Sequence, residues 1–246
     1  MGVDLTGGRS ISRFGDVDMK SPLIVALDFE TAVEARVLVN TLGDAAGFYK
    51  VGLELFTSAG MDFVRELKAQ GKRVFLDLKM YDIGETVKRA AAVVAKSGAD
   101  FLTVHAIRPV VMAACGGRGD SSLKILSVTV LTSFDEGDLR GDGHSKTVGE
   151  LVELRAHNAL DAGTDGIVCS AHEVKRVRTM AGPKAILVVP GVRSAGAAKG
   201  DQKRVATPIQ ALADGADHLV IGRQVTRAED PKAEMERVLE EIQCPT

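Results

Sequence analysis

Eight short apolar runs follow one another along the chain, and an amphipathic segment separates each run from the next. The runs are hydrophobic throughout rather than at alternate positions, which is typical of parallel strands covered by helices. Eight β/α units in a chain of this length predict an α/β fold, a closed (β/α)8 TIM barrel with a single domain. An open doubly wound sheet is the alternative. The predicted strands span residues 23–27, 48–52, 74–78, 101–105, 125–131, 166–170, 185–189 and 218–222.

The segments between the runs carry signals of helix starts and ends. A capping box, in which Ser or Thr and a Glu three residues later satisfy the first free backbone amides, opens three of them. The three pairs are Thr31 with Glu34, Thr147 with Glu150, and Ser170 with Glu173. A Gly-x-Asp sequence recurs before three of the strands, and we interpret its glycine as a left-handed helix stop. These glycines are Gly98, Gly163 and Gly215.

Length and composition fit one large globular domain. The chain has 246 residues, of which 45% are hydrophobic and 26% charged, and barrels of this size occur undivided. Residues 1–20 are rich in glycine and charge and contain no apolar run that suits a signal peptide or a membrane span. We therefore expect a flexible N-terminal extension at 1–20 and a catalytic barrel domain at 21–246.

The charge balance and the cysteine content limit which binding partners and which cellular location suit this chain. The chain carries 31 basic and 33 acidic residues, so nothing favours a nucleic acid or an anionic membrane as partner. Cys115, Cys169 and Cys244 are odd in number and lack metal-ligand spacing. We expect reduced thiols in a cytoplasmic protein without structural zinc.

The stretch VFLDLKMYDIGET, residues 74–86, places charges at the mouth of an apolar strand. Asp77 and Lys79 fall on one face because strand side chains alternate, and Asp82 follows where the turn begins. Buried charges are costly unless they are paired. With Lys50 from the second strand, we interpret the stretch as a catalytic network that holds each ammonium between carboxylates and keeps Lys79 a cationic proton donor. A structural salt-bridge network at the barrel rim is the alternative.

Two loops near the end of the chain suit a phosphate group. They are VVPGVRSAGAAKGDQKR, residues 188–204, and VIGRQVT, residues 220–226. Barrels bind phosphate through loop amides and a helix N-terminus after the seventh and eighth strands. Arg223 could make a charge-assisted contact with a phosphate dianion, and the loop with Arg193 and Gln202 has the composition of a closing lid. A solvated surface loop is the alternative.

Taken together, these segments resemble one known family. DLKMYDIGET looks like the DxKxxDI signature of orotidine 5′-phosphate decarboxylase, and the likeness covers nearly everything from Pro22 onward. The other matching motifs are VALD at 25–28, YKVG at 49–52, LTS at 131–133, PGVR at 190–193, GDQKR at 200–204 and IGRQVT at 221–226. The resemblance implies a homodimeric lyase of pyrimidine biosynthesis that converts orotidine 5′-monophosphate to UMP and CO2 without a cofactor or a metal.

The resemblance also implies a role for each matching residue. Lys79 would stabilise a C6 carbanion and donate the proton, within a charged tetrad completed by Lys50, Asp77 and Asp82. Asp28 and Lys50 match ribose contacts, and Thr132 matches the pyrimidine contact. The phosphate set would be Arg193, Gln202, Gly222 and Arg223. Asp82, Ile83 and Thr86 would reach the site of the neighbouring subunit.

The chain departs from the family pattern in two places. Gly84-Glu85 stands where many relatives have Pro-Asn, which concerns the local turn and helix start rather than the chemistry. The fourth strand ends in HAIRPVV where HASGG is commoner, and His105 is more typical of a hydrogen-bonded structural residue than of a catalyst. We therefore leave His105 out of the catalytic set.

Two other functions fit the same fold. The related 3-keto-gulonate-6-phosphate decarboxylase and hexulose-phosphate synthase share the DxKxxD motif but place a magnesium-binding glutamate in the second strand. This chain has Lys50 there, and a protonated lysine cannot bind a metal. A non-catalytic phosphosugar-binding barrel is the other alternative, and the complete charge network disfavours it.

Overall fold

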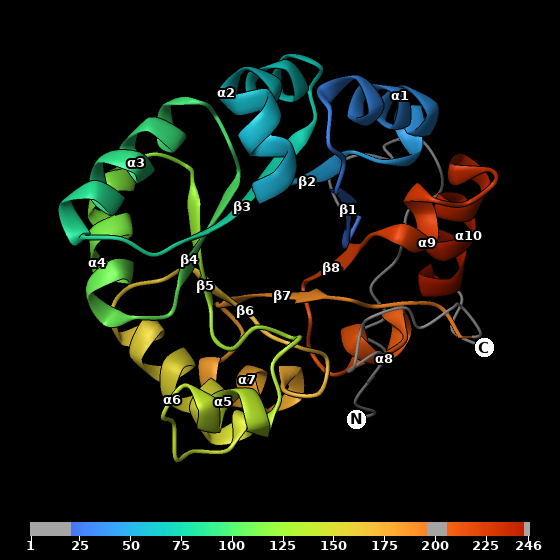
Figure 1. Ribbon diagram of the computed structural model, residues 1–246. Coiled ribbons are helices and arrows are strands. Elements are labelled where there is room, and N and C mark those ends of the chain that lie inside the picture. The colour runs from blue at the N-terminus through green and yellow to red at the C-terminus, as the bar shows by residue number, and fades with distance from the viewer. Residues whose placement is uncertain (1–20, 196–205, 244–246) are drawn as a thin grey trace, which may run out of the picture.

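The computed structural model describes residues 21–195 and 206–243, and in them eight parallel strands close into a barrel (Figure 1). The strands pair in chain order, and β1 also pairs with β8, with Ile24 opposite Val220. This closure confirms the predicted (β/α)8 barrel and excludes the open sheet. The strands are β1 (Leu23–Leu27), β2 (Phe48–Gly52), β3 (Arg73–Met80), β4 (Phe101–His105), β5 (Lys124–Val128), β6 (Gly166–Val168), β7 (Ile186–Pro190) and β8 (His218–Ile221).

The helices form a ring around the strands, with α3 and α4 packed together on one side and α10 against α1 on the other (Figure 1). Their bounds are α1 (Ala32–Leu42), α2 (Leu53–Ala69), α3 (Gly84–Lys96), α4 (Arg108–Arg118), α5 (Glu136–Gly141), α6 (Val148–Asp161), α7 (Val174–Ala181), α8 (Pro208–Ala213), α9 (Arg223–Thr226) and α10 (Pro231–Gln243), with a short 3-10 helix η1 (Gly43–Ala45). The apolar face of α1 is buried against the barrel at Ala35, Leu38, Val39 and Leu42.

Two apolar layers hold this arrangement together. The larger layer lies between the strands and the helices, and the smaller one fills the barrel interior with side chains such as Phe48, Phe75 and Phe101. Side chains therefore occupy the lumen as a packed core rather than leaving a pore. A ligand can be accommodated only beyond the ends of the strands.

The Gly-x-Asp repeats mark three helix ends, as predicted. Their glycines have positive φ angles of 80°, 92° and 106° at residues 98, 163 and 215, which glycine adopts without steric cost. Each aspartate accepts a hydrogen bond from a backbone amide of the preceding strand. The three bonds join Val74 N to Asp100, Ile125 N to Asp165, and Leu187 N to Asp217 at 2.7–2.9 Å. The repeat thus stabilises the amino-terminal face of the barrel.

Two of the three predicted capping boxes begin helices, and the third does not. Thr31 and Glu34 cap α1, and Thr147 and Glu150 cap α6. The third prediction is wrong because α7 begins only at Val174. There the Glu173 carboxylate accepts hydrogen bonds from the amide and the hydroxyl of Ser170 and so closes the turn between β6 and α7.

Three predictions concern residues outside the described ranges: the extension at 1–20, the role of Gln202 and the thiol of Cys244. Cys115 and Cys169 are free cysteines. Between residues 21 and 195 and between 206 and 243, no helix combines the length and the apolarity needed to cross a membrane.

His218, at the start of β8, lies in an aromatic cluster at the amino-terminal end of the barrel. Its ring centroid is 5.5 Å from that of Phe48 and 5.4 Å from that of Phe101. Its Nδ1 atom is buried and has no hydrogen-bond partner among the described residues. Burial, and then the charge of Arg73, lower the pKa of His218 from 6.5 to about 4, against the opposing influences of Asp217 and Pro22.

We expect this histidine to make folding stability depend on pH. Between pH 6.5 and about 4 the unfolded chain protonates His218 while the folded chain does not, so stability falls as the pH falls. The loss amounts to about 3 kcal/mol, because each unit of pKa shift corresponds to about 1.4 kcal/mol. Urea unfolding across this pH range should show a steeper decline for the native protein than for His218→Phe, which keeps a ring and cannot titrate. Parallel curves for the two proteins would contradict the assignment.

Candidate active site

Four charged side chains of alternating sign meet at the carboxyl ends of β1, β2 and β3. Lys50 Nζ lies 2.8 Å from Asp28 Oδ1 and 3.8 Å from Asp77 Oδ2. Lys79 Nζ lies 2.8 Å from the same Asp77 oxygen. Lys50 is therefore held between two carboxylates, as predicted, whereas Lys79 contacts Asp77 alone among the carboxylates of the described residues.

Asp77 is the centre of this network, and its side chain is only 12% exposed. Burial pushes the pKa of Asp77 up, but Lys50 and Lys79, together with hydrogen bonds from Lys79 and Thr103, outweigh burial and leave the pKa below its usual value. Asp77 is thus a largely buried carboxylate that stays ionised at neutral pH. Its negative charge faces the ammonium groups of Lys79 at 2.8 Å and Lys50 at 3.8 Å.

The backbone at Lys79 is unusual. Lys79 has a φ of 47°, and among the described residues it is the only non-glycine with a positive φ. The pairing of β3 with β4 shifts here, since Leu76 lies opposite Leu102 but Met80 lies opposite Val104. Positive φ in a non-glycine residue is found preferentially at functional sites, where the surrounding structure must hold it. The chain therefore departs from regular strand geometry at the residue whose amine completes the network.

Gly52 makes room for the contact between Lys50 and Asp28. A Cβ atom at Gly52 would lie 3.0 Å from Lys50 Nζ and 3.3 Å from Asp28 Oδ1. Any larger side chain would press on this ion pair. The glycine of the YKVG motif is therefore explained by the charge network beside it rather than by a turn.

A cavity of about 350 Å³ opens above the network, a size suited to a small ligand. The polar residues that line it come from the ends of six different strands, as the barrel architecture predicts. They are Asp28, Lys50, Asp77, Lys79, Thr132, Ser133, Arg193, Arg223 and Gln224, and Gly222 also lies in the wall. The structure thus brings together in one cavity all the predicted site residues of the described ranges except Asp82, Ile83 and Thr86.

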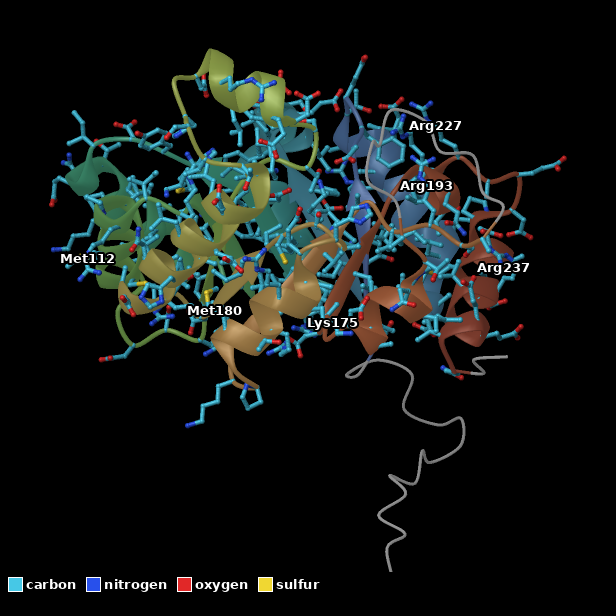
Figure 2. The ribbon with its side chains drawn as sticks, turned by 90° about the horizontal axis from the view of Figure 1, so that it is seen from below. Met112, Lys175, Met180, Arg193, Arg227 and Arg237 are labelled. Atoms are coloured by element: carbon cyan, nitrogen blue, oxygen red, sulfur yellow. The ribbon has the colours of Figure 1, made fainter. Side chains whose placement is uncertain are left out.

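Arg193 and Arg223 form the cationic side of the cavity. The pKa of Arg193 is lowered by burial and then by the charge of Arg223, so two like charges stand near one another. An anion bound beside them would offset the repulsion between the two guanidinium groups. Arg193 lies on the side of the molecule that carries α10 with Arg237, away from Met112 of α4 (Figure 2). The two arginines follow β7 and β8, whereas the charge network stands at the ends of β1, β2 and β3, so the two groups line the same cavity from different strands.

Gln224 secures the loop that carries Arg193. Its side-chain oxygen accepts a hydrogen bond from Ser194 N at 3.0 Å, and its amide nitrogen donates to Ser194 Oγ and to Glu234 Oε1, each at 2.8 Å. The loop after β7 is thus tied to α9 and α10. The sequence does not reveal this role, because Gln224 contacts residues far away in the chain.

Asp82, Ile83 and Thr86 lie apart from the cavity. All three are exposed, and Asp82 makes no ion pair within the described part of the chain. Its carboxylate instead accepts a hydrogen bond from Ile83 N at 2.6 Å. Tyr81 and Ile83 are 68% and 77% exposed, so large apolar side chains and a carboxylate project together from the rim of the barrel.

Two further residues beside the network were not included in the predicted site. Thr103 on β4 bonds both Asp77 and Lys79, and His105 at the end of the same strand adjoins the network. Burial, and then Arg155 and Lys79, lower the pKa of His105. A signal for Thr103 was present in the sequence, because it is an inward-facing hydroxyl between Phe101 and His105 in an otherwise apolar strand.

A closed parallel barrel whose charged residues converge at the carboxyl ends of its strands defines the class of (β/α)8-barrel enzymes. Within that class, the chain belongs to the orotidine 5′-phosphate decarboxylase / HUMPS family, whose model matches residues 21–238. The family membership predicted from the DxKxxDI motif and its companions is thereby confirmed.

Three similar proteins carry the name of this family. The chain is 52% identical over 224 residues to an orotidine 5′-phosphate decarboxylase of Caulobacter vibrioides, covering 89% of this chain and 96% of that protein. It is 50% identical over 220 residues to one of Rhodopseudomonas palustris, covering 89% and 94% of the two chains. The crystal structure of orotidine 5′-phosphate decarboxylase from Lactobacillus acidophilus superposes with a TM-score of 0.81 at 37% identity, covering 91% of this chain and 99% of that one.

Proposed function

We propose that this protein decarboxylates orotidine 5′-monophosphate to UMP and CO2 in pyrimidine biosynthesis, without a metal or a cofactor. The observation that carries the proposal is the Lys79 ammonium, which lies 2.8 Å from a buried, ionised Asp77 at the wall of the cavity. The names of relatives that are about half identical over most of the chain support the choice of substrate.

The proposed mechanism follows from the fixed charges. Loss of CO2 from C6 leaves a carbanion on the pyrimidine ring, which a preorganised ammonium stabilises far better than water does. Lys79 supplies that ammonium and then donates its proton to C6. Asp77, which also faces Lys50, holds the amine in place, so that little reorganisation is needed when negative charge develops at C6.

The charged and polar lining of the cavity suggests how the rest of the nucleotide would bind. Its cationic side, with Arg193 and Arg223, would neutralise the phosphate dianion, together with Gly222 and with Gln202, which lies outside the described residues. Asp28 and Lys50 would contact the ribose, and Thr132 the pyrimidine. Binding energy from the phosphate, remote from C6, would then contribute to transition-state stabilisation at the ring.

Lys50 distinguishes this proposal from the metal-dependent members of the wider family. In 3-keto-gulonate-6-phosphate decarboxylase and hexulose-phosphate synthase a glutamate at this place helps to bind magnesium. Here an ammonium lies between Asp28 and Asp77, and its positive charge would repel a divalent cation from both carboxylates. This arrangement favours the metal-free reaction.

A homodimer is part of the proposal. The exposed apolar side chains of Tyr81 and Ile83 beside Asp82 form a surface suited to burial against a second copy. In such a dimer Asp82, Ile83 and Thr86 would reach the partner's cavity, and Asp82 would supply the second carboxylate for Lys79. We also propose a cytoplasmic location, in keeping with the free cysteines.

The function is tested by following orotidine 5′-monophosphate with purified protein that has been treated with EDTA. We expect UMP to form at the same rate before and after chelation. 3-Keto-gulonate 6-phosphate, the substrate of the metal-dependent decarboxylase, should not be turned over under the same conditions. If activity disappears with EDTA and returns with magnesium, the metal-dependent alternative holds instead, and if orotidine 5′-monophosphate binds but is not converted, the protein is a binding barrel.

A further inference from the structure

Thr103 lies on β4 with its side chain turned into the barrel, and it is fully buried. Its hydroxyl oxygen accepts a hydrogen bond from the backbone amide of Lys79 at 2.9 Å. The same hydroxyl donates to Asp77 Oδ1 at 2.8 Å. One side chain therefore contacts both members of the Asp77–Lys79 ion pair. It accepts a hydrogen bond from Lys79 and donates one to Asp77.

The first bond compensates for the irregular backbone at Lys79. Regular pairing between β3 and β4 is interrupted between Leu76 and Met80, so a strand partner does not take up the Lys79 amide. The hydroxyl of Thr103 satisfies this amide instead, at the residue with a φ of 47°. A non-glycine residue stays in that conformation only when its surroundings hold it there.

The second bond orients the carboxylate. Asp77 Oδ2 lies 2.8 Å from Lys79 Nζ, from which it accepts a hydrogen bond, and 3.8 Å from Lys50 Nζ. Thr103 occupies the other oxygen, Oδ1. With both oxygens engaged, the carboxylate plane cannot rotate freely, and the direction of the Lys79 amine is set by that plane.

We propose that Thr103 is a positioning residue for the reaction, because its hydroxyl fixes both the backbone from which Lys79 projects and the carboxylate on which its amine rests. The inference rests on the proposed function, since it concerns how the amine is aimed at C6. Thr103 itself lies beneath the network and does not belong to the cavity lining. It acts through Asp77 and Lys79 rather than on the substrate.

The test compares Thr103→Val, which keeps the shape and loses both bonds, with Thr103→Ser, which keeps the hydroxyl. Thr164→Val is a matched control at the amino-terminal face. The hydroxyl of Thr164 is also buried and also bridges two groups, since it donates to Ile125 O at 2.8 Å and accepts from Ser127 Oγ at 3.0 Å. Both valine variants therefore lose a doubly bonded buried hydroxyl, but only one does so beside Lys79.

We expect kcat for orotidine 5′-monophosphate to fall about 100-fold in Thr103→Val with KM changed less than about threefold, because misplaced catalytic groups lose rate rather than ground-state binding. Thr103→Ser should stay within about fivefold of the native kcat, and Thr164→Val should keep the native kcat despite a similar loss of stability. The acid limb of kcat should also move to higher pH in Thr103→Val, since the pKa of Asp77 rises when a donor is lost. Thr103→Ala serves the same purpose if the valine variant does not fold.

The inference is overturned if Thr103→Val retains kcat within about threefold, or if Thr164→Val loses as much rate as Thr103→Val. A crystal structure of Thr103→Val gives a readout that does not depend on turnover. It should show a changed φ at Lys79 or a displaced amine, and native geometry at both would also overturn the inference. If the native protein fails to convert the substrate while Lys79 moves in the variant, the proposed function fails and the positioning role of Thr103 stands.

Discussion

Lys79→Ala is expected to lower kcat for orotidine 5′-monophosphate by at least about 10⁴-fold, since it removes electrostatic stabilisation and proton donation together. The fold should survive, because the Lys79 side chain is 37% exposed and contributes little to the core. Asp77 would keep its hydrogen bond from Thr103 and its contact with Lys50. Single-turnover measurements of UMP formation, with circular dichroism as the check on folding, decide the result.

Lys68→Ala is the matched control for this variant. Lys68 Nζ lies 2.7 Å from Asp100 Oδ2, and the Lys68 side chain, like that of Lys79, is partly exposed, at 27% against 37%. This ion pair belongs to the amino-terminal face of the barrel, away from the cavity, so its loss should alter stability and leave kcat within about twofold. A kcat within about tenfold of the native value in Lys79→Ala would remove Lys79 from its proposed role.

The strands and most of the cavity could be predicted because they depend on local patterns. Eight continuous apolar runs can hardly be arranged otherwise than as covered parallel strands, and parallel strands bring their carboxyl ends to one face. Residues placed just after those ends, such as Asp28, Thr132 and Arg223, therefore had to meet. Thr31 and Glu34 illustrate the same point for helices, since the whole capping box lies within four residues.

The contacts around Lys79 could not be predicted, because they depend on the register between two strands. The four residue steps of β3 from Leu76 to Met80 lie opposite only two residue steps of β4, from Leu102 to Val104. Simple alternation places Asp77 and Lys79 on one face, which holds, but it gives no sign of the positive φ at Lys79. Nothing in the residues around Lys79 marks a left-handed position, which glycine, asparagine and aspartate normally occupy.

The outward position of Asp82 does not follow from the spacing of the motif, although the family resemblance implies that Asp82 reaches the neighbouring subunit. The linear motif sets Asp82 three residues after Lys79, but the chain turns at the barrel rim and carries its carboxylate out to the surface. Within one chain the network therefore has Asp28, Lys50, Asp77 and Lys79, and the fourth member of the predicted tetrad stands outside it. A residue that would act on another subunit leaves no trace in the contacts of a single chain, so the proposed dimer needs a test of its own.

A mixture of Lys79→Ala and Asp82→Ala proteins is expected to recover about a quarter of the native activity, although each protein alone is nearly inactive. In a two-fold symmetric dimer each site would use Lys79 of one chain and Asp82 of the other. A mixed dimer then contains one site with both mutations and one site with neither. Random exchange makes about half of all dimers mixed, so about a quarter of all sites are native. Subunit exchange is established by co-purification through two different affinity tags.

Pairing Lys79→Ala with Asp77→Ala provides the decisive control. Asp77 and Lys79 contact each other within one chain at 2.8 Å, so every site in that mixed dimer lacks one of the two residues and activity should stay at the level of the separate mutants. Recovery with Asp82→Ala but not with Asp77→Ala assigns Asp82 to the opposite subunit and keeps the rest of the network in one chain. Equal recovery in both mixtures, or none in either despite proven exchange, contradicts the shared site. The exposed carboxylate of Asp82 would then belong to the solvated rim, and Lys79 would work with Asp77 alone.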